Sequence, residues 1–191
     1  MVRIRRGSER SSYGDGVAGE VSRIEGVTRV QRTFGFVDVS GFTAFTDLHG
    51  DAAAVEVLEH SRGLIRRYAS VYGVRVAKWL GDGAMIVGVH PEPTIEALVD
   101  IVDEANRREN APRLRAGVAV GDVIMFEGDD HIGQAVNLAS RLADLAKAGE
   151  ILAPATINSP LLVNTVLVPH GQHTVPGIKV PLEIARLERR V

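Results

Sequence analysis

Two aspartates follow apolar segments of this chain at positions where a metal ion could bind. Asp38 lies near the end of the apolar run TFGFVDVSGFTAF, and Asp82 lies between two glycines in LGDGAM. A buried carboxylate without a partner is costly or takes up a proton, so Asp38 needs a partner. If that partner is Asp82, a cation between the two carboxylates would offset their repulsion. Ligands that are all oxygen favour a hard ion, Mg²⁺ or Mn²⁺.

Each aspartate also has a plainer interpretation. Asp-Gly is common in turns, so Asp82 can be explained as a turn residue. Asp38 can be explained as the cap of a short helix that begins at Gly41 or Phe42. Taken singly, the two residues leave both interpretations open.

The elements that must position these residues alternate in a regular order. An apolar strand over 32–39 precedes a helix over about 51–72, and VRVAKWL and AMIVGV then flank a Gly-Asp-Gly sequence that predicts a hairpin. A helix over about 93–109 follows, and LRAGVAV and DVIMFEG are predicted to form another strand pair. The next helix, over about 134–148, is expected to end at Gly149.

This β-α-β-β-α-β order predicts a ferredoxin-like fold of the α/β (α+β) class, an antiparallel sheet with its helices on one face. A C-terminal extension adds a short strand over 150–153 and a hairpin around 165–187. In a ferredoxin-like sheet the first and third strands are antiparallel neighbours. Asp38 at the end of the first strand is therefore expected beside Asp82, which precedes the third.

Composition limits the class of protein. The chain has 191 residues, 45% of them hydrophobic, which predicts a single domain over 31–191 after a flexible leader over 1–30 that is rich in Gly, Ser and charge. A formal charge of −2 gives no reason to expect nucleic acid or a membrane surface as a partner. The chain has no cysteine, no signal-type segment and no apolar run of about 18 residues, so we expect a soluble, cytoplasmic protein.

Three segments, in this order, resemble the class III nucleotidyl cyclase catalytic domain: FVDVSGFT, KWLGDGAM and DHIGQAVNLASRL. The resemblance covers about Gln31 to Val191 and is to short single-domain bacterial adenylyl cyclases. It implies that Asp38 and Asp82, helped by the backbone carbonyl of Val39, hold two Mg²⁺ or Mn²⁺ ions per active site. The interval of 44 residues between the two aspartates is typical of that family.

The SGFT turn after Asp38 is expected to contact phosphate. Backbone N–H groups at a helix start favour anions, so the predicted contacts are the amides of Ser40, Gly41, Phe42 and Thr43. Gly41 can also be explained as an ordinary helix-start glycine.

The third segment carries Asn137 and Arg141, which are four residues apart on the expected helix and so project from one face. By resemblance, Asn137 orients the ribose and Arg141 stabilises the transition state at the α-phosphorus, a role that suits a planar, permanently charged guanidinium. A single helix arginine is more often a solvated charge. Steps of seven and four residues from Asp130 through Asn137 to Arg141 nevertheless reproduce the family pattern.

Base choice is assigned to Lys78 and Asp130. Adenine presents an acceptor at N1 and a donor at N6, whereas guanine presents the opposite pair. A lysine donor with an aspartate acceptor therefore predicts ATP as substrate, because a mismatched base leaves polar groups unpaired. Lys78 alone can also be explained as a charge that protects an edge strand.

Two segments depart from the family pattern. GDVIMFEGDD, over 121–130, is shorter than the arm with which mammalian members clasp the partner subunit. Pro176 stands where a phosphate-binding lysine is often found, and Lys179 is the candidate to replace it.

The resulting prediction is an adenylate cyclase that converts ATP to 3′,5′-cyclic AMP and pyrophosphate. In the family, the metal carboxylates of one subunit face the base-reading and transition-state residues of another, and this chain carries both halves, so we expect a homodimer with two shared sites. The alternatives are a guanylyl cyclase and a catalytically silent nucleotide-binding module. No regulator is indicated, because a leader of about 30 residues is too short for a sensor domain.

Overall fold

The computed structural model describes residues 23–24, 27–126 and 130–190. Most of the expected leader, residues 1–22, lies outside the described residues. Strand β1 (Arg23–Ile24) pairs with the first residues of β2 (Val27–Val39), so the ordered sheet begins before the predicted boundary at Gln31.

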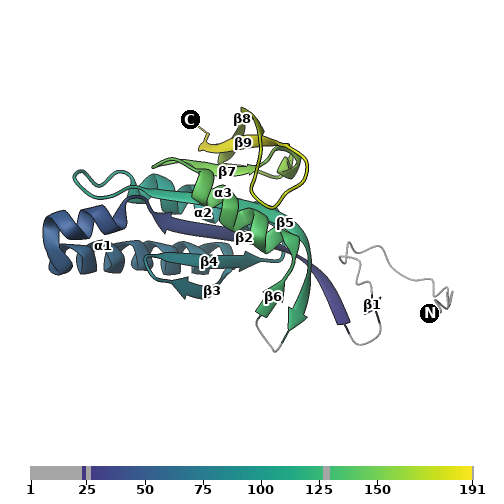
Figure 1. Cartoon of the computed structure of the whole chain (residues 1–191), viewed down its shortest axis with the longest axis horizontal. Helices are drawn as coiled ribbons and strands as arrows, with labels where there is room; N and C mark the ends of the chain where they lie inside the picture. Colours follow the sequence, from purple (N-terminus) through teal and green to yellow (C-terminus); the bar gives the residue numbers. More distant parts are fainter. Residues whose placement is uncertain (1–22, 25–26, 127–129, 191) are drawn as a thin grey trace.

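The described strands form one sheet with the order β3-β4-β2-β5-β7-β9-β8, and β6 pairs with the end of β5 (Figure 1). The strand bounds are β3 Arg75–Leu80, β4 Gly83–Gly88, β5 Leu114–Phe126, β6 Asp130–Ile132, β7 Ile151–Pro154, β8 Thr165–His173 and β9 Leu182–Arg189. β5 and β7 are parallel, whereas the other described pairs are antiparallel. The order of β3, β4, β2 and β5 is ferredoxin-like, as predicted, and β7 with the β8–β9 hairpin forms the predicted extension.

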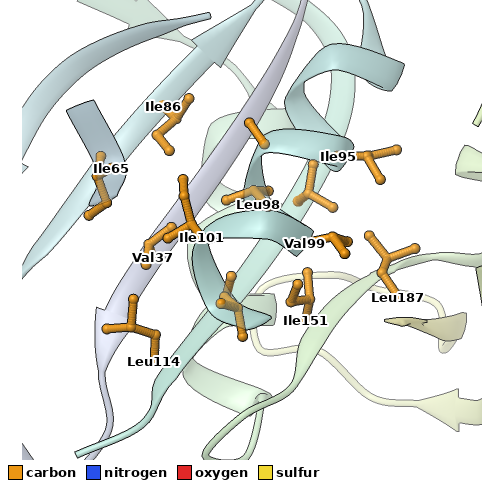
Figure 2. Packing of buried hydrophobic residues seen from close by; sticks show 14 of the residues in the cluster. Val37, Ile65, Ile86, Ile95, Leu98, Val99, Ile101, Leu114, Ile151 and Leu187 are labelled. Carbon is orange, nitrogen blue, oxygen red and sulfur yellow. The ribbon is translucent and has the colours of Figure 1, made fainter. Parts of the chain in front are cut away.

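Side chains of the central strand β2 alternate between two cores, because successive residues of a strand point to opposite faces. Val37 lies in the core beneath helices α1 (Phe42–Tyr72) and α2 (Pro91–Ala105), where Figure 2 shows it beside Ile101 and Leu98. Phe34 lies in the core beneath α3 (Gln134–Leu145). The prediction of helices on one face holds for the two helices of the βαββαβ unit, and α3 covers the opposite face.

Gly117 permits the close contact between α3 and the sheet. A Cβ atom at this position would lie 2.2 Å from the backbone nitrogen of Ala143 and 2.3 Å from the carbonyl oxygen of Ala139. Both atoms belong to the helix backbone and cannot rotate away. A side chain on β5 at this point would therefore push α3 off the sheet.

The predicted strand pair LRAGVAV and DVIMFEG was wrong, because β5 is a single strand. It pairs with β2 without a break from Leu114 to Ile124, and Gly121 lies opposite Arg32 inside this ladder. Gly-Asp at 121–122 therefore forms no turn. The long partner strand satisfies the backbone hydrogen bonds of β5 throughout this stretch.

Helix bounds also differ from those predicted. α1 begins at Phe42 and is interrupted at Gly50, which has φ +81°, so the predicted helix over 51–72 is its second part. α2 ends at Ala105, before the predicted residue 109. α3 ends at Leu145, although Gly149, with φ +90°, does adopt the left-handed conformation expected of it.

Candidate active site

Asp38 lies beside the turn that carries Asp82, as the fold predicts. β2 and β4 are antiparallel, with Val37 opposite Ala84. A Cβ atom at Gly83 would lie 2.5 Å from the carbonyl oxygen of Val37 and 3.4 Å from Oδ1 of Asp38. A glycine after Asp82 thus lets the turn approach the end of β2 closely.

The electrostatics of Asp82 are those of a carboxylate near a like charge. Burial raises the pKa of Asp82, and the charge of Asp38 raises it further, while Arg115 acts in the opposite direction. The crowded pair of carboxylates inferred from the sequence is therefore present in the fold.

Arg115 is a second partner of Asp38 and has no counterpart among the residues predicted from sequence. It lies directly opposite Asp38 in the β2–β5 ladder. Its Nε and Nη2 donate to Oδ2 of Asp38 at 3.0 and 2.7 Å, and its Nη1 donates to the carbonyl oxygen of Asp144 at 2.9 Å. The register of a ferredoxin-like sheet, in which the first and last strands pair, was the signal that could have found it.

The two oxygens of Asp38 therefore have different surroundings. Oδ2 accepts both hydrogen bonds from Arg115, whereas Oδ1 is the oxygen next to Gly83 and the turn. A cavity of about 170 Å³ opens beside Asp38, between Leu80 of the sheet and Ser140 and Asp144 of α3. Oδ1 of Asp38 lies on the side of the turn that carries Asp82.

These donors fit a hard divalent cation. Within the described part of the chain, no group of three or more His, Cys, Asp or Glu side chains could hold a metal. Asp38 at the end of β2 and Asp82 in the β3–β4 turn match the usual binding of Mg²⁺, in which one or two carboxylates act together with phosphate oxygens of a substrate. The set thus suits an ion that arrives with a nucleotide.

The amide of Ser40 is not free for phosphate, which corrects the prediction for this residue. Its N–H donates to the carbonyl oxygen of Arg113 at 2.9 Å. This bond continues the pairing of Val39 with Leu114 by one step past the end of β2, and the ladder thus uses the donor that the sequence assigned to a ligand.

The other residues of the SGFT turn form the start of α1. Gly41 is the N-cap with φ +71°, and its carbonyl accepts the first helical bond from Phe45 at 3.0 Å. The N–H groups of Phe42 and Thr43 precede that bond, so they have no acceptor within the helix. The N-cap has no side-chain hydrogen bond, which removes the interpretation of Asp38 as a helix cap.

Lys78 and Asp130, which are 52 residues apart, form an ion pair between the edge strand β3 and β6. Both side chains are about half exposed. The hydrogen bond and charge of Lys78 lower the pKa of Asp130. The fold therefore brings together the two side chains that the sequence assigned to base recognition.

Asn137 and Arg141 are exposed on α3, four residues apart. The Arg141 guanidinium lies against Gly177, where a Cβ atom would be 3.3 Å from Nη2. Lys179 is exposed in the same segment, between β8 and β9. Among the described residues, no hydrogen bond or ion pair joins these side chains to Asp38 or Asp82. The chain thus carries the carboxylates on β2 and the β3–β4 turn, and Asn137 and Arg141 on α3.

Comparison with known proteins places these groups in a family. Residues 28–184 match the model of the adenylate and guanylate cyclase catalytic domain. This chain belongs to the class III nucleotidyl cyclase family. The matched range contains every candidate residue of the site.

Two curated relatives of this cyclase domain come from Mycobacterium tuberculosis. An uncharacterised protein of Mycobacterium tuberculosis is 34% identical over 171 residues, which is 90% of this chain and 43% of the relative. A pH-sensitive adenylate cyclase of the same species is 33% identical over 134 residues, covering 69% of this chain and 32% of the relative. The cyclase domain therefore spans less than half the length of these relatives.

Solved cyclase structures share the fold. The adenylyl cyclase CyaB from P. aeruginosa superimposes with a TM-score of 0.73 at 24% identity, covering 86% of this chain and 97% of the other. The catalytic core of a rhodopsin-guanylyl cyclase with converted specificity, in complex with ATPαS, gives a TM-score of 0.75 at 21% identity, covering 86% and 99%. None of the helices in the described residues has the length and apolar character needed to cross a membrane.

Proposed function

We propose that this cyclase domain is an adenylate cyclase, which converts ATP to 3′,5′-cyclic AMP and pyrophosphate. The observation that carries the proposal is the contact between Lys78 and Asp130, because it sets a cationic donor beside an anionic acceptor. That pair complements N1 and the N6 amino group of adenine and mismatches guanine at both positions. Relatives named as adenylate cyclases support the same substrate.

Asp38 and Asp82 would hold two Mg²⁺ or Mn²⁺ ions with the carbonyl of Val39. When bound, the ions lower the pKa of the ribose 3′-hydroxyl and neutralise charge on the phosphates. Arg115 keeps Oδ2 of Asp38 paired, which would leave Oδ1 and Asp82 to bind the ions. The orientation of Asp38 would then be set by Arg115 before an ion binds.

The phosphates would lie at the start of α1, where the amides of Phe42 and Thr43 have no helical acceptor. Gly41 keeps its predicted phosphate contact through its own amide. Lys179 would approach the terminal phosphates from the segment between β8 and β9. Arg141 would stabilise charge that develops at the α-phosphorus, and Asn137 would orient the ribose.

A homodimer would complete the site. As the family resemblance implies, the carboxylates of one subunit would face Asn137 and Arg141 of a second copy. Apolar side chains near the Lys78–Asp130 pair support this arrangement, since Leu80, Met125 and Ile132 are 45%, 40% and 55% exposed. A second subunit would remove them from water.

The test measures cyclic AMP and cyclic GMP formed from ATP and GTP with Mn²⁺. Wild type should use ATP, and Arg141→Ala should lose activity. The double variant Lys78→Glu with Asp130→Gly should move relative kcat/KM toward GTP by about 2–5 kcal/mol, if each base contact contributes about 1–3 kcal/mol.

Lys179→Ala is the matched control, because a phosphate contact is common to both nucleotides and its loss should lower both rates alike. Equal use of ATP and GTP by the wild type would overturn the adenylate assignment. An unchanged ATP-to-GTP ratio in the folded double variant would remove Lys78 and Asp130 from the site, and no product from either nucleotide would favour the silent module.

A further inference from the structure

Arg62, on the second part of α1, reaches the turn that carries Asp82. Its Nη2 donates to the carbonyl oxygen of Gly81 at 2.9 Å, although the two residues are 19 positions apart. Gly81 and Asp82 are the two central residues of the β3–β4 turn, because Leu80 pairs with Gly83. The helix thus contacts the backbone next to a proposed metal ligand.

The hydrogen-bonded carbonyl belongs to the peptide between the two central residues of that turn. Gly81 has φ +63°, whereas Asp82 is not among the residues with positive φ, so the turn has the pattern of type II′. Rotation of the central peptide would convert it to type I′, in which Asp82 also needs a positive φ. The rotation would redirect the Cα–Cβ bond of Asp82 and move its carboxylate.

A hydrogen bond to this carbonyl therefore also restrains the orientation of the Asp82 side chain. Glycine at position 81 allows both turn types, so the local resistance to the rotation is the positive φ that type I′ requires of Asp82. Arg62 also opposes the rotation from outside the turn, since the rotated peptide would point its oxygen away from the guanidinium.

The Trp79 ring holds the guanidinium of Arg62 in place. Arg62 lies 5.1 Å from the centroid of the Trp79 ring, and Arg66, one helical turn later, lies 5.0 Å from it. Trp79 itself packs against the main hydrophobic core. Both arginines share the cation–π contact, but only Arg62 also bonds the turn. The chain therefore contains its own matched control.

We propose that Arg62 is a positioning residue for Asp82, which holds the Gly81–Asp82 peptide in the orientation that lets both carboxylates bind a divalent cation. The proposal rests on the proposed function, because it takes Asp38 and Asp82 as the metal ligands. Arg62 acts through the backbone and does not contact substrate or ion.

The experiment titrates Mn²⁺ into the nucleotide-free protein and follows the electron paramagnetic resonance signal of the free ion. Arg62→Ala should weaken Mn²⁺ binding about fivefold, the factor expected for loss of one net hydrogen bond. Arg66→Ala should bind as wild type does. Arg62→Lys, which keeps a charged donor over Trp79, should stay within about twofold of wild type.

Activity supplies a second measurement. The Mn²⁺ concentration for half-maximal cyclisation should rise about fivefold in Arg62→Ala, while kcat at saturating Mn²⁺ stays within about twofold. The Tm without metal should be lowered to a similar extent in Arg62→Ala and Arg66→Ala, since both variants lose the contact with Trp79. A merely structural role would instead lower kcat and stability without changing the metal requirement.

The outcomes separate the two proposals. Equal Mn²⁺ affinity in wild type and Arg62→Ala would overturn the role of Arg62 and leave the proposed function intact. Equal weakening in Arg62→Ala and Arg66→Ala would also overturn it, because stacking on Trp79 would then explain the effect. Absence of Mn²⁺ binding by the nucleotide-free wild type would overturn the role of Arg62, whereas the proposed function is decided by product formation from ATP and GTP.

Discussion

Asp38 shows how one side chain can have two partners of opposite charge. Arg115 binds its Oδ2, whereas Gly83 and the Asp82 turn lie on the side of Oδ1. The cost of burying Asp38 is met by a guanidinium even without metal. At Asp82, burial and the charge of Asp38 outweigh the opposing effects of a backbone hydrogen bond and of Arg115, so its pKa is raised. The two carboxylates should therefore respond differently to substitution.

Asp82→Asn should stabilise the metal-free protein at neutral pH. Because the pKa of Asp82 is raised on folding, ionisation lowers folded-state stability, and this loss grows as the pH rises through the folded pKa. It vanishes below the ordinary pKa of Asp, about 4. Thermal unfolding should show a higher Tm for Asp82→Asn than for wild type at pH 7.5, and equal Tm values near pH 3.5 if both chains remain folded.

Asp38→Asn is the paired comparison and should destabilise the same protein at pH 7.5 by about 1 kcal/mol, because Arg115 loses its charged partner. Saturating Mn²⁺ should raise the Tm of wild type and of neither variant. Stabilisation by Asp38→Asn equal to that by Asp82→Asn would show that repulsion dominates at both positions, contrary to the contacts of Arg115.

The family motifs assigned Lys78 and Asp130 to the same base, and the predicted order of the strands placed Asp38 beside Asp82. Neither was enough to find Arg115. No motif contains this residue, and its contact with Asp38 depends on the register between strands 77 residues apart in sequence. Long-range register is set by the packing of both sheet faces and is weakly marked in local sequence.

At the scale of elements, glycine was the main source of both correct and incorrect predictions. Gly-Asp-Gly at 81–83 forms the predicted hairpin turn, whereas Gly121 lies inside an unbroken strand. Local propensity could not separate these cases, because β2 extends far enough to pair with β5 on both sides of Gly121. Gly117 has yet another role, the contact with α3, which became visible only in three dimensions.

Gly117→Ala should destabilise the domain by about 1–3 kcal/mol, because its methyl group would overlap backbone atoms of α3. Gly63→Ala is the matched control. Gly63 lies in α1 with nothing within 4 Å of the place that a methyl group would occupy, so alanine there should stabilise by about 0.5–1 kcal/mol. Urea unfolding of both variants measures the difference, and equal stabilities would contradict the close contact of α3 with β5.

At the scale of the whole molecule, the proposed site would be shared between the subunits of a homodimer, one supplying the carboxylates and the other Asn137 and Arg141. Asp38→Ala and Asn137→Ala should each be inactive alone, and a mixture of the two should regain activity, because the hybrid dimer contains one site with both groups intact. Random exchange makes about half of the dimers hybrids, each with one good site, so roughly a quarter of wild-type activity is the ceiling.

The matched control is a mixture of Asp38→Ala and Asp82→Ala, in which both changes fall in the same group. This mixture should stay inactive. Cyclic AMP production after verified subunit exchange is the measurement. Recovery of cyclase activity in the control mixture would be incompatible with a shared site, and so would absence of recovery in the mixture of Asp38→Ala and Asn137→Ala.

The contact between Lys78 and Asp130 also affects how the proposed site would select between adenine and guanine. Without nucleotide, Lys78 and Asp130 already bond each other. Each side chain therefore fills the position that the edge of a base would take. If the proposed function holds, an entering adenine would exchange that contact for two others, and the gain in free energy would be only the difference between two bonded states. Guanine would break the same contact and leave both groups facing like partners. Selectivity would then come mainly from exclusion of the wrong base, and only weakly from attraction to the right one.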